Sequence, residues 1–163
     1  MSQPTDAAAR GEPGANLASI RMIFAAGGFP RGLGRTLGIT GTEADEGRVV
    51  LVGTPNEDHT NPLGSVHGGY VAAMLDSAIA LAVFTVLPPG AGYATTDLKI
   101  AYLRAVLAGT GPVRAEGRVI NQGRRLVLGE ATLMDRDGRL CAHATGSCMV
   151  IEQDGRREAG GST

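Results

Sequence analysis

The sequence predicts an α+β protein in which a curved antiparallel sheet of about six strands wraps around one central helix, about residues 66–87. The first observation is the apolar run YVAAMLDSAIALAVFTVL, which is too long for a strand and ends at a Pro-Pro pair, as a buried helix does. The second is that four segments with strand patterning follow this run. The third is small residues at alternate positions in the last two segments, which let a sheet curve and approach a bulky helix. These small residues are Gly129, Ala131, Ala142, Ala144, Gly146 and Cys148.

The length and composition indicate one domain. The chain has 163 residues, 43% of them hydrophobic, which suits a single core. We expect residues 16–151 to form this domain, with disordered tails at 1–15 and 152–163. The opening segment MSQPTDAAARGEPGAN lacks a basic start followed by an apolar stretch, so it is not a secretory signal.

Three elements are expected before the long helix. Residues 17–24 have helical apolar spacing, with Asn16 as a possible N-cap, and GGFPRGLG ends this helix. Residues 35–40 and 47–53 predict two strands joined by the polar turn GTEADE. The segment 54–65 is rich in turn-forming residues and predicts a loop.

Four strands are expected after the helix, at 93–103, 113–121, 125–134 and 140–151. The second alternates between charged residues and small or apolar ones, so one face of the sheet meets water. The sequence DRDG between the last two strands is a strong hairpin signal.

The charge balance and the long helix exclude two classes of partner. Fifteen Lys and Arg balance sixteen Asp and Glu, for a formal charge of -1, so the chain has no electrostatic footprint for nucleic acid or an anionic membrane. The long helix is near the length of a membrane span. However, Asp76 at a bilayer centre would cost about 2.5–3.5 kcal/mol, and no basic residues flank the segment. The helix is therefore expected at the centre of a soluble fold.

The two cysteines predict a reduced thiol pair. Cys141 and Cys148 fall in one predicted strand, which would hold them roughly 23 Å apart, too far for a disulfide. Free thiols favour a cytoplasmic location. The sequence has no metal-ligand set, no GxGxxG and no P-loop, so neither a metal nor another cofactor is expected.

Asp76 is the one charged residue within the long apolar helix. A buried carboxylate needs a partner, and its helical neighbours Ala72, Ala73, Ile79 and Ala80 cannot supply one. Its partner therefore lies on another element, or is a water or a ligand. The alternative is a purely structural acid that is paired in the core.

His67, Gly68 and Gly69 stand where this helix begins. The first N–H groups of a helix lack internal acceptors, and with the helix dipole they favour negative charge, including the oxyanion of an attacked ester or thioester. The alternative is that the glycines only permit close helix–sheet packing and that His67 is a satisfied cap.

Taken together, Asn61, the HGG at 67–69 and Asp76 form the pattern N-P-L-G-x-x-H-G-G-x(6)-D. This pattern resembles the hotdog-fold acyl-CoA thioesterases of the phenylacetate-pathway type. The resemblance covers roughly residues 35–151 and extends to DLKIAYLR and NQGRR. It implies a sheet wrapped around the helix, assembly into dimers and usually tetramers, and hydrolysis of an acyl-CoA thioester.

The resemblance also implies roles for single residues. Asp76 matches the acid that acts as general base or nucleophile, Gly68 the backbone N–H that receives the thioester oxygen, and Asn61 the amide beside it. A hydroxyl that assists water in some members corresponds to Thr95 or Thr96, of which we prefer Thr95. His67 and Gly69 complete the motif as candidate site residues. The chain departs from many relatives at Ala105, where they have Pro, so the shape of this loop and its contacts to CoA can differ from theirs.

Helix geometry adds a prediction that the motif does not state. Gly68 and Asp76 are eight residues apart, or about 12 Å at 1.5 Å per residue, too far to serve one thioester directly. If two such helices lie antiparallel across a two-fold axis, Asp76 of one chain can face Gly68 of the other. We therefore expect that activity needs a homodimer.

Other parts of the substrate site are less sharply defined by the sequence. Arg104, Arg124 and Arg125 are placed to reach the phosphates of CoA, although ordinary surface arginines would look the same. Candidates for the acyl pocket are Tyr70, Met74 and Phe84, which are equally good core residues.

Two competing functions remain open at this point. A hotdog-type hydratase or dehydratase would need a histidine near Asp76, and because His67 is nine residues away, His59 or His143 would have to be recruited. A non-catalytic acyl-CoA-binding module is the other alternative. A regulator of that kind would be expected to carry a further domain, and residues 1–34 offer only one short helix.

Overall fold

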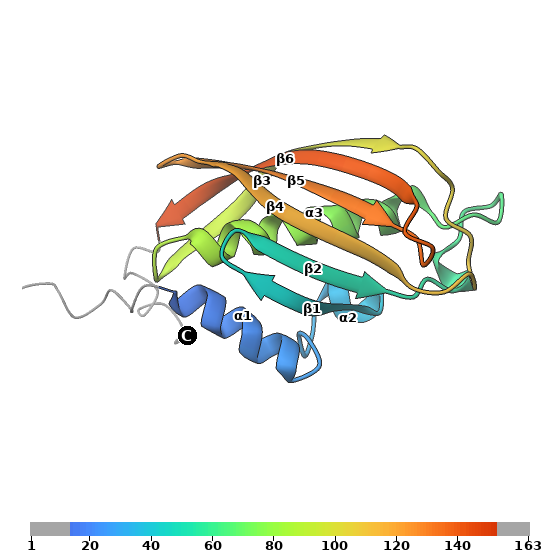
Figure 1. Ribbon diagram of the computed structural model, residues 1–163, viewed down its shortest axis with the longest axis horizontal. Helices are drawn as coiled ribbons and strands as arrows, with labels where there is room; N and C mark the ends of the chain where they lie inside the picture. Colours follow the sequence, from blue (N-terminus) through green and yellow to red (C-terminus); the bar gives the residue numbers. More distant parts are fainter. Residues whose placement is uncertain (1–13, 153–163) are drawn as a thin grey trace, which may run out of the picture.

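The computed structural model describes residues 14–152 and contains a six-stranded antiparallel sheet curved around one long helix (Figure 1). The strand order is β1-β2-β4-β5-β6-β3, so β1 and β3 are the two edges of the sheet. The predicted fold class is confirmed. The elements are α1 (Ala15–Ala25), α2 (Leu33–Thr36), β1 (Ile39–Asp45), β2 (Arg48–Gly53), the 3-10 turn η1 (Glu57–His59), α3 (Gly68–Val86), β3 (Ala91–Tyr102), β4 (Val113–Gln122), β5 (Leu126–Met134) and β6 (Leu140–Glu152).

Small residues on the inner face of the sheet allow α3 to pack closely against it. A Cβ atom on Gly117 of β4 would clash with the carbonyl group of Ala78, and one on Gly129 of β5 would lie 2.8 Å from the Ile79 side chain. Ala131 and Ala144 face the same core and are almost fully buried. The predicted reason for the small residues is confirmed, because the sheet backbone approaches the helix backbone directly.

By length and composition alone, α3 is apolar enough to span a bilayer. In the structure it is the core helix, because the sheet curves around it and most of its residues are buried. A helix with apolar residues on nearly every side is expected to be buried in this way.

The first hairpin differs from the prediction. The strand predicted at residues 35–40 begins only at Ile39, because residues 35 and 36 belong to the short helix α2. Most of GTEADE is strand, and the actual turn is Glu46–Gly47, where Gly47 has a φ of 70°. The prediction failed because β1 is an edge strand with a polar outer face and a bulge between Gly41 and Glu43, so its composition resembles a turn.

Helix α1 covers the β1 edge. Its Ile20 is 1% exposed, and the Arg21 Nε donates a hydrogen bond to the carbonyl of Ala44 on β1, at 2.8 Å. The predicted N-cap is wrong, since Gly14 occupies that position and Asn16 is buried, donating from Nδ2 to the Leu87 carbonyl at 3.1 Å. Asn16 therefore fastens α1 to the end of α3.

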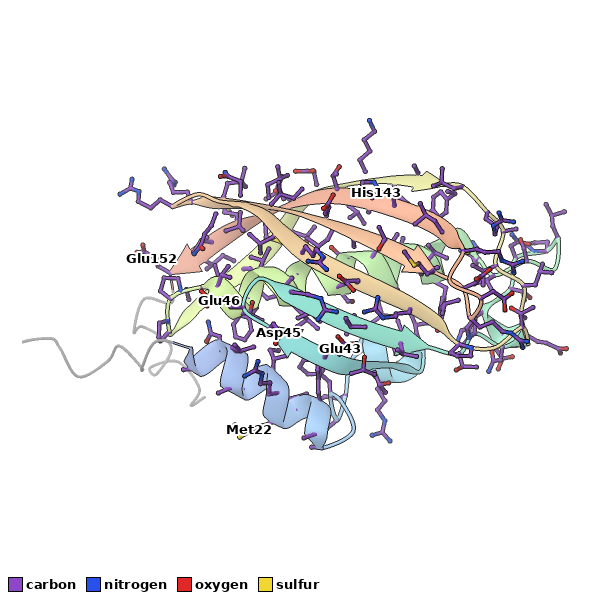
Figure 2. The ribbon with its side chains drawn as sticks, in the orientation of Figure 1. Met22, Glu43, Asp45, Glu46, His143 and Glu152 are labelled. Carbon is purple, nitrogen blue, oxygen red and sulfur yellow. The ribbon has the colours of Figure 1, made fainter. Side chains whose placement is uncertain are left out.

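The outer face of β2 and β4 carries a cluster of ion pairs. Glu116 is bound by Arg48, Arg114 and Arg118, and these hydrogen bonds, that from Arg48 above all, lower the pKa of Glu116 to about 2. Glu43 of β1 joins the cluster through Arg48, at 2.7 Å, and is labelled on the outside of the hairpin in Figure 2. The predicted alternation of β4 is confirmed, with Ala115 among the buried residues between these charges.

The end of the chain agrees with expectation. Asp135 and Gly138 form the β5–β6 turn, where the Gly138 N–H donates to the Asp135 carbonyl at 3.0 Å. Cys141 and Cys148 are both buried on β6 as free thiols. The predicted terminal tails lie outside the described residues, apart from Gly14, Ala15 and Glu152.

Candidate active site

Asp76 lies on a stripe of α3 that the sheet leaves uncovered. Its neighbours Leu75 and Ala78 are completely buried, whereas Asp76 and Ser77 are only half-buried. Because the sheet curves around the helix, residues from both of its edges, β1 and β3, line the cavity beside this stripe. We call this gap between the two sheet edges the seam. The seam explains how a helix that is otherwise buried in the core can carry one carboxylate.

The partner of Asp76 is a hydroxyl on β3. Thr95 Oγ1 donates a hydrogen bond to Asp76 Oδ1, at 2.9 Å. A bulge between Thr95 and Asp97 makes Thr96 the extra residue of the strand, and Thr96 Oγ1 donates to the Ser147 carbonyl instead, at 3.1 Å. The structure therefore brings Thr95, and not Thr96, to the carboxylate.

Asp76 and Thr95 open into an apolar cavity of about 290 Å³. The residues expected to form an acyl pocket, Tyr70, Met74 and Phe84, do not line it; Tyr70 and Met74 are core residues. Much of its wall comes from the segment between α1 and β1, which sequence reasoning treated only as a helix terminator. The available signal was that GGFPRGLG places a large aromatic residue among glycines. The apolar lining residues are Phe24, Phe29, Leu33, Ile39, Leu51, Ala80, Leu81 and Tyr93.

Among residues 14–152, Thr95 is the hydrogen-bond partner of the Asp76 side chain, and Arg31 lines the same cavity without pairing with it. Burial raises the pKa of the Tyr93 hydroxyl, and nearby Cys148 and Asp76 raise it further. Burial is also the main cause that raises the pKa of the Cys148 thiol. Among residues 14–152, no cation forms an ion pair with Asp76. A carboxylate held by one hydroxyl at the side of an apolar cavity can serve as a base toward water or as a nucleophile.

The start of α3 forms a second polar centre. His67 is the N-cap, and its Nδ1 accepts a hydrogen bond from the Gly69 N–H at 2.8 Å. The Gly68 N–H has no acceptor among the described residues, whereas its carbonyl accepts from the Tyr102 hydroxyl at 3.0 Å. Gly68 lines a separate cavity of about 310 Å³, together with Ser65, Tyr102 and Arg104.

Asn61 organises the loop that leads into α3. Its Nδ2 donates to Ser65 Oγ at 2.8 Å, and its Oδ1 accepts from the Leu63 N–H at 2.9 Å. It lines neither the cavity of Asp76 nor that of Gly68. In this structure its amide is engaged within its own loop.

The three arginines predicted to bind phosphate are not brought together. The Arg104 N–H donates to the Cys141 carbonyl, whereas the Arg125 carbonyl accepts from the Val150 N–H. Cys141 and Val150 are nine residues apart on β6, or roughly 30 Å at 3.3 Å per residue. Arg104 therefore lies at the Gly68 end of the sheet, and Arg124 and Arg125 lie at the opposite end.

The two histidines that a hydratase would recruit lie away from Asp76. His59 Nδ1 accepts from the Asn56 N–H, and His143 Nε2 is 3.4 Å from Glu130. Figure 2 labels His143 on the sheet, and neither histidine lines the cavity of Asp76. Within residues 14–152, no group of three or more His, Cys, Asp or Glu side chains could hold a metal ion.

Comparison with known proteins agrees with the fold and with the family that the motif resembles. The profile of the thioesterase superfamily matches residues 63–142. Acyl-coenzyme A thioesterase 13 of Homo sapiens is 30% identical over 126 residues, which cover 76% of this chain and 89% of that protein.

Two solved structures are also similar. A phenylacetic acid degradation-related protein of Ralstonia eutropha JMP134 is 30% identical, with a TM-score of 0.71 over 80% of this chain and 98% of that one. The Escherichia coli PaaI protein shares the fold, at 23% identity and a TM-score of 0.74 over 84% of this chain and 96% of that one. The chain thus belongs to the thioesterase superfamily, as a thioester hydrolase with the hotdog fold.

Proposed function

We propose that the protein hydrolyses an acyl-CoA thioester to the free acid and CoA, with Asp76 as the catalytic carboxylate. The observation that carries this proposal is the Thr95–Asp76 hydrogen bond of 2.9 Å at the side of an apolar cavity. The cavity suits an acyl group, and the carboxylate lies where a thioester carbonyl would enter it. The similarity to acyl-coenzyme A thioesterase 13 supports the same substrate class.

In the general-base route, Asp76 takes a proton from water as the water oxygen attacks the thioester carbonyl. The Thr95 hydroxyl holds the carboxylate, and a Gly68 N–H receives the oxyanion. Collapse of the tetrahedral intermediate breaks the carbon–sulfur bond and releases the CoA thiolate, which takes up a proton. In the nucleophilic route, Asp76 attacks the carbonyl itself, the carbon–sulfur bond breaks and releases the CoA thiolate, which takes up a proton, and water then hydrolyses the resulting anhydride.

We further propose that each site is shared between two subunits. Gly68 and Asp76 of one chain are about 12 Å apart along α3 and line different cavities. The midpoint between them is at Ala72 and Ala73, which are small and not fully buried, so a second helix can approach closely there. An antiparallel α3 across a two-fold axis at this point would bring the partner's Gly68 to Asp76.

The two edges of the sheet support such a dimer. Strand β1 is covered by α1, whereas β3 has only β6 as a strand neighbour among the described residues. An open edge of twelve residues is a template for pairing with another chain. Pairing of β3 with a second β3 would place the two α3 helices side by side. A tetramer and a cytoplasmic location remain predictions.

Thiol release from phenylacetyl-, hydroxybenzoyl-, short-chain and medium-chain CoA esters tests the proposal. Asp76→Ala and Asp76→Asn are expected to lose turnover while remaining dimeric, and Asp137→Asn, in the exposed β5–β6 turn, is the matched carboxylate control. Binding of the CoA esters without turnover by the wild type would instead identify an acyl-CoA-binding module. A single turnover in ¹⁸O water identifies the nucleophilic route if the first product is unlabelled, because water that attacks the Asp76 carbonyl carbon of the anhydride leaves an unlabelled Asp76 oxygen on the product.

A further inference from the structure

We propose that Arg31 is a specificity residue that binds a carboxylate at the far end of the acyl group. This inference rests on the proposed thioesterase function and extends it to a substrate class, acyl groups that end in an acid. Arg31 and Asp76 are the two charged residues that line the 290 Å³ cavity, and no ion pair joins them.

Arg31 differs from most of the arginines among residues 14–152. Arg21, Arg48 and Arg139, for example, form ion pairs with acidic side chains. Arg31 has neither an ion pair nor a side-chain hydrogen bond within the described part of the chain. A guanidinium at the wall of an apolar cavity, with all its donors available, is suited to bidentate recognition of a carboxylate.

The backbone around Arg31 is fixed by local structure. Gly28 and Gly32 have φ values of 102° and 103°, which other residues rarely adopt, and Pro30 restricts the chain between them. The Arg35 side chain donates to the Pro30 carbonyl at 3.1 Å. The segment therefore presents Arg31 to the cavity from a defined position, on the wall contributed by residues 24–34.

An anionic oxygen in this cavity could come from the acyl group or from the phosphates of CoA. The position of Arg31 favours the acyl group, because Arg31 lines the same cavity as Asp76, the proposed catalytic carboxylate. The cavity volume equals that of about ten water molecules at ~30 Å³ each, which fits a short acyl chain with its terminal acid.

A pair of isosteric substrates separates the two sources. Glutaryl-CoA carries a terminal carboxylate, and 5-methylhexanoyl-CoA replaces its two oxygens with methyl groups. We expect the wild type to prefer glutaryl-CoA in kcat/KM by about tenfold, the size of one charged hydrogen-bonded contact at a half-open site. Arg31→Gln is expected to abolish this preference and Arg31→Lys to retain part of it. Arg21→Gln, on the neighbouring α1, is the matched control and should keep it.

Three results would overturn the assignment. They are a wild type without preference, a preference that survives in Arg31→Gln, and an equal loss on both substrates, which would indicate contact with CoA. Calorimetric titration of both esters into the Asp76→Asn variant gives the same comparison without turnover. Failure of the thioesterase proposal looks different, because no ester in the panel would then release thiol from the wild type.

Discussion

Replacing Gly68 by proline removes the proposed oxyanion donor and leaves most of the helix start intact. Gly68 is the first residue of α3, a position where proline is favoured because the missing N–H has no partner in the helix. His67 before it has φ −61° and ψ 136°, the extended conformation that a residue preceding proline prefers. A Cβ at Gly68 would lie 3.4 Å from atoms of Tyr102, an ordinary contact.

The expected effect follows from the loss of a single donor to the oxyanion. Removal of one such donor lowers kcat by about 10²–10³, or about 2.7–4 kcal/mol of transition-state stabilisation. Gly68→Ala adds the same Cβ and keeps the N–H, so it is the matched control and should remain near wild type. Thiol release gives the rates, and thermal melting by circular dichroism checks the fold. Turnover of Gly68→Pro within tenfold of Gly68→Ala, at equal stability, would refute the assignment of this N–H.

Mixing two inactive variants tests whether the site spans two subunits. In a heterodimer of Gly68→Pro and Asp76→Ala chains, a shared site combines the intact Asp76 of the first with the intact Gly68 of the second. Random assortment makes half of the dimers mixed, with one working site in each, so about a quarter of wild-type sites return. A site contained within one chain would regain nothing on mixing, and that result would contradict the shared-site proposal.

Three further predictions concern stability and reactivity. Gly117→Ala should destabilise the protein by about 1–3 kcal/mol in chemical denaturation, and by more than Gly129→Ala, because its Cβ meets helix backbone rather than mainly a side chain. The Glu116 carboxylate has its pKa lowered to about 2, so its contribution, on the order of 2–3 kcal/mol, is complete above about pH 4.5 and is lost as the pH falls towards 2. Glu116→Gln should therefore show a smaller loss of unfolding free energy between pH 5 and pH 2.5, measured by denaturant titration. Cys141 and Cys148 should not react with a thiol reagent in the folded protein, because both are buried and burial raises the pKa of each thiol; rapid labelling without denaturant would contradict this.

The core of the fold could be predicted because its signals are local and redundant. The length and composition of α3 indicate a buried helix, and the Pro-Pro pair marks its end. The sequence DRDG indicates a hairpin. The small residues of β5 and β6 further indicated that a helix packs on this face. The first strand could not be placed in the same way, because the outer face of edge strand β1 is as polar as a turn.

The candidate site was predicted only in part. The motif indicated Asp76, His67 and Gly68, and the structure adds the hydrogen bond that selects Thr95 over Thr96. That selection depends on a bulge in β3, which is a property of strand register and leaves no trace in composition. The cavity wall at residues 24–34 was missed because it forms only when a segment distant in sequence packs across the seam.

The residues that stabilise the fold are different from the residues that line the cavity at the seam and would select the substrate. Gly117 and the buried side of α3 stabilise the fold, and larger side chains there would clash with neighbouring atoms. Helix α2 has no buried residue, and Arg31 and Leu33 beside the cavity are exposed. Substitutions in this wall would therefore change which acyl groups enter at little cost in folding free energy. Substrate preference could therefore change during evolution while the stability of the fold is kept.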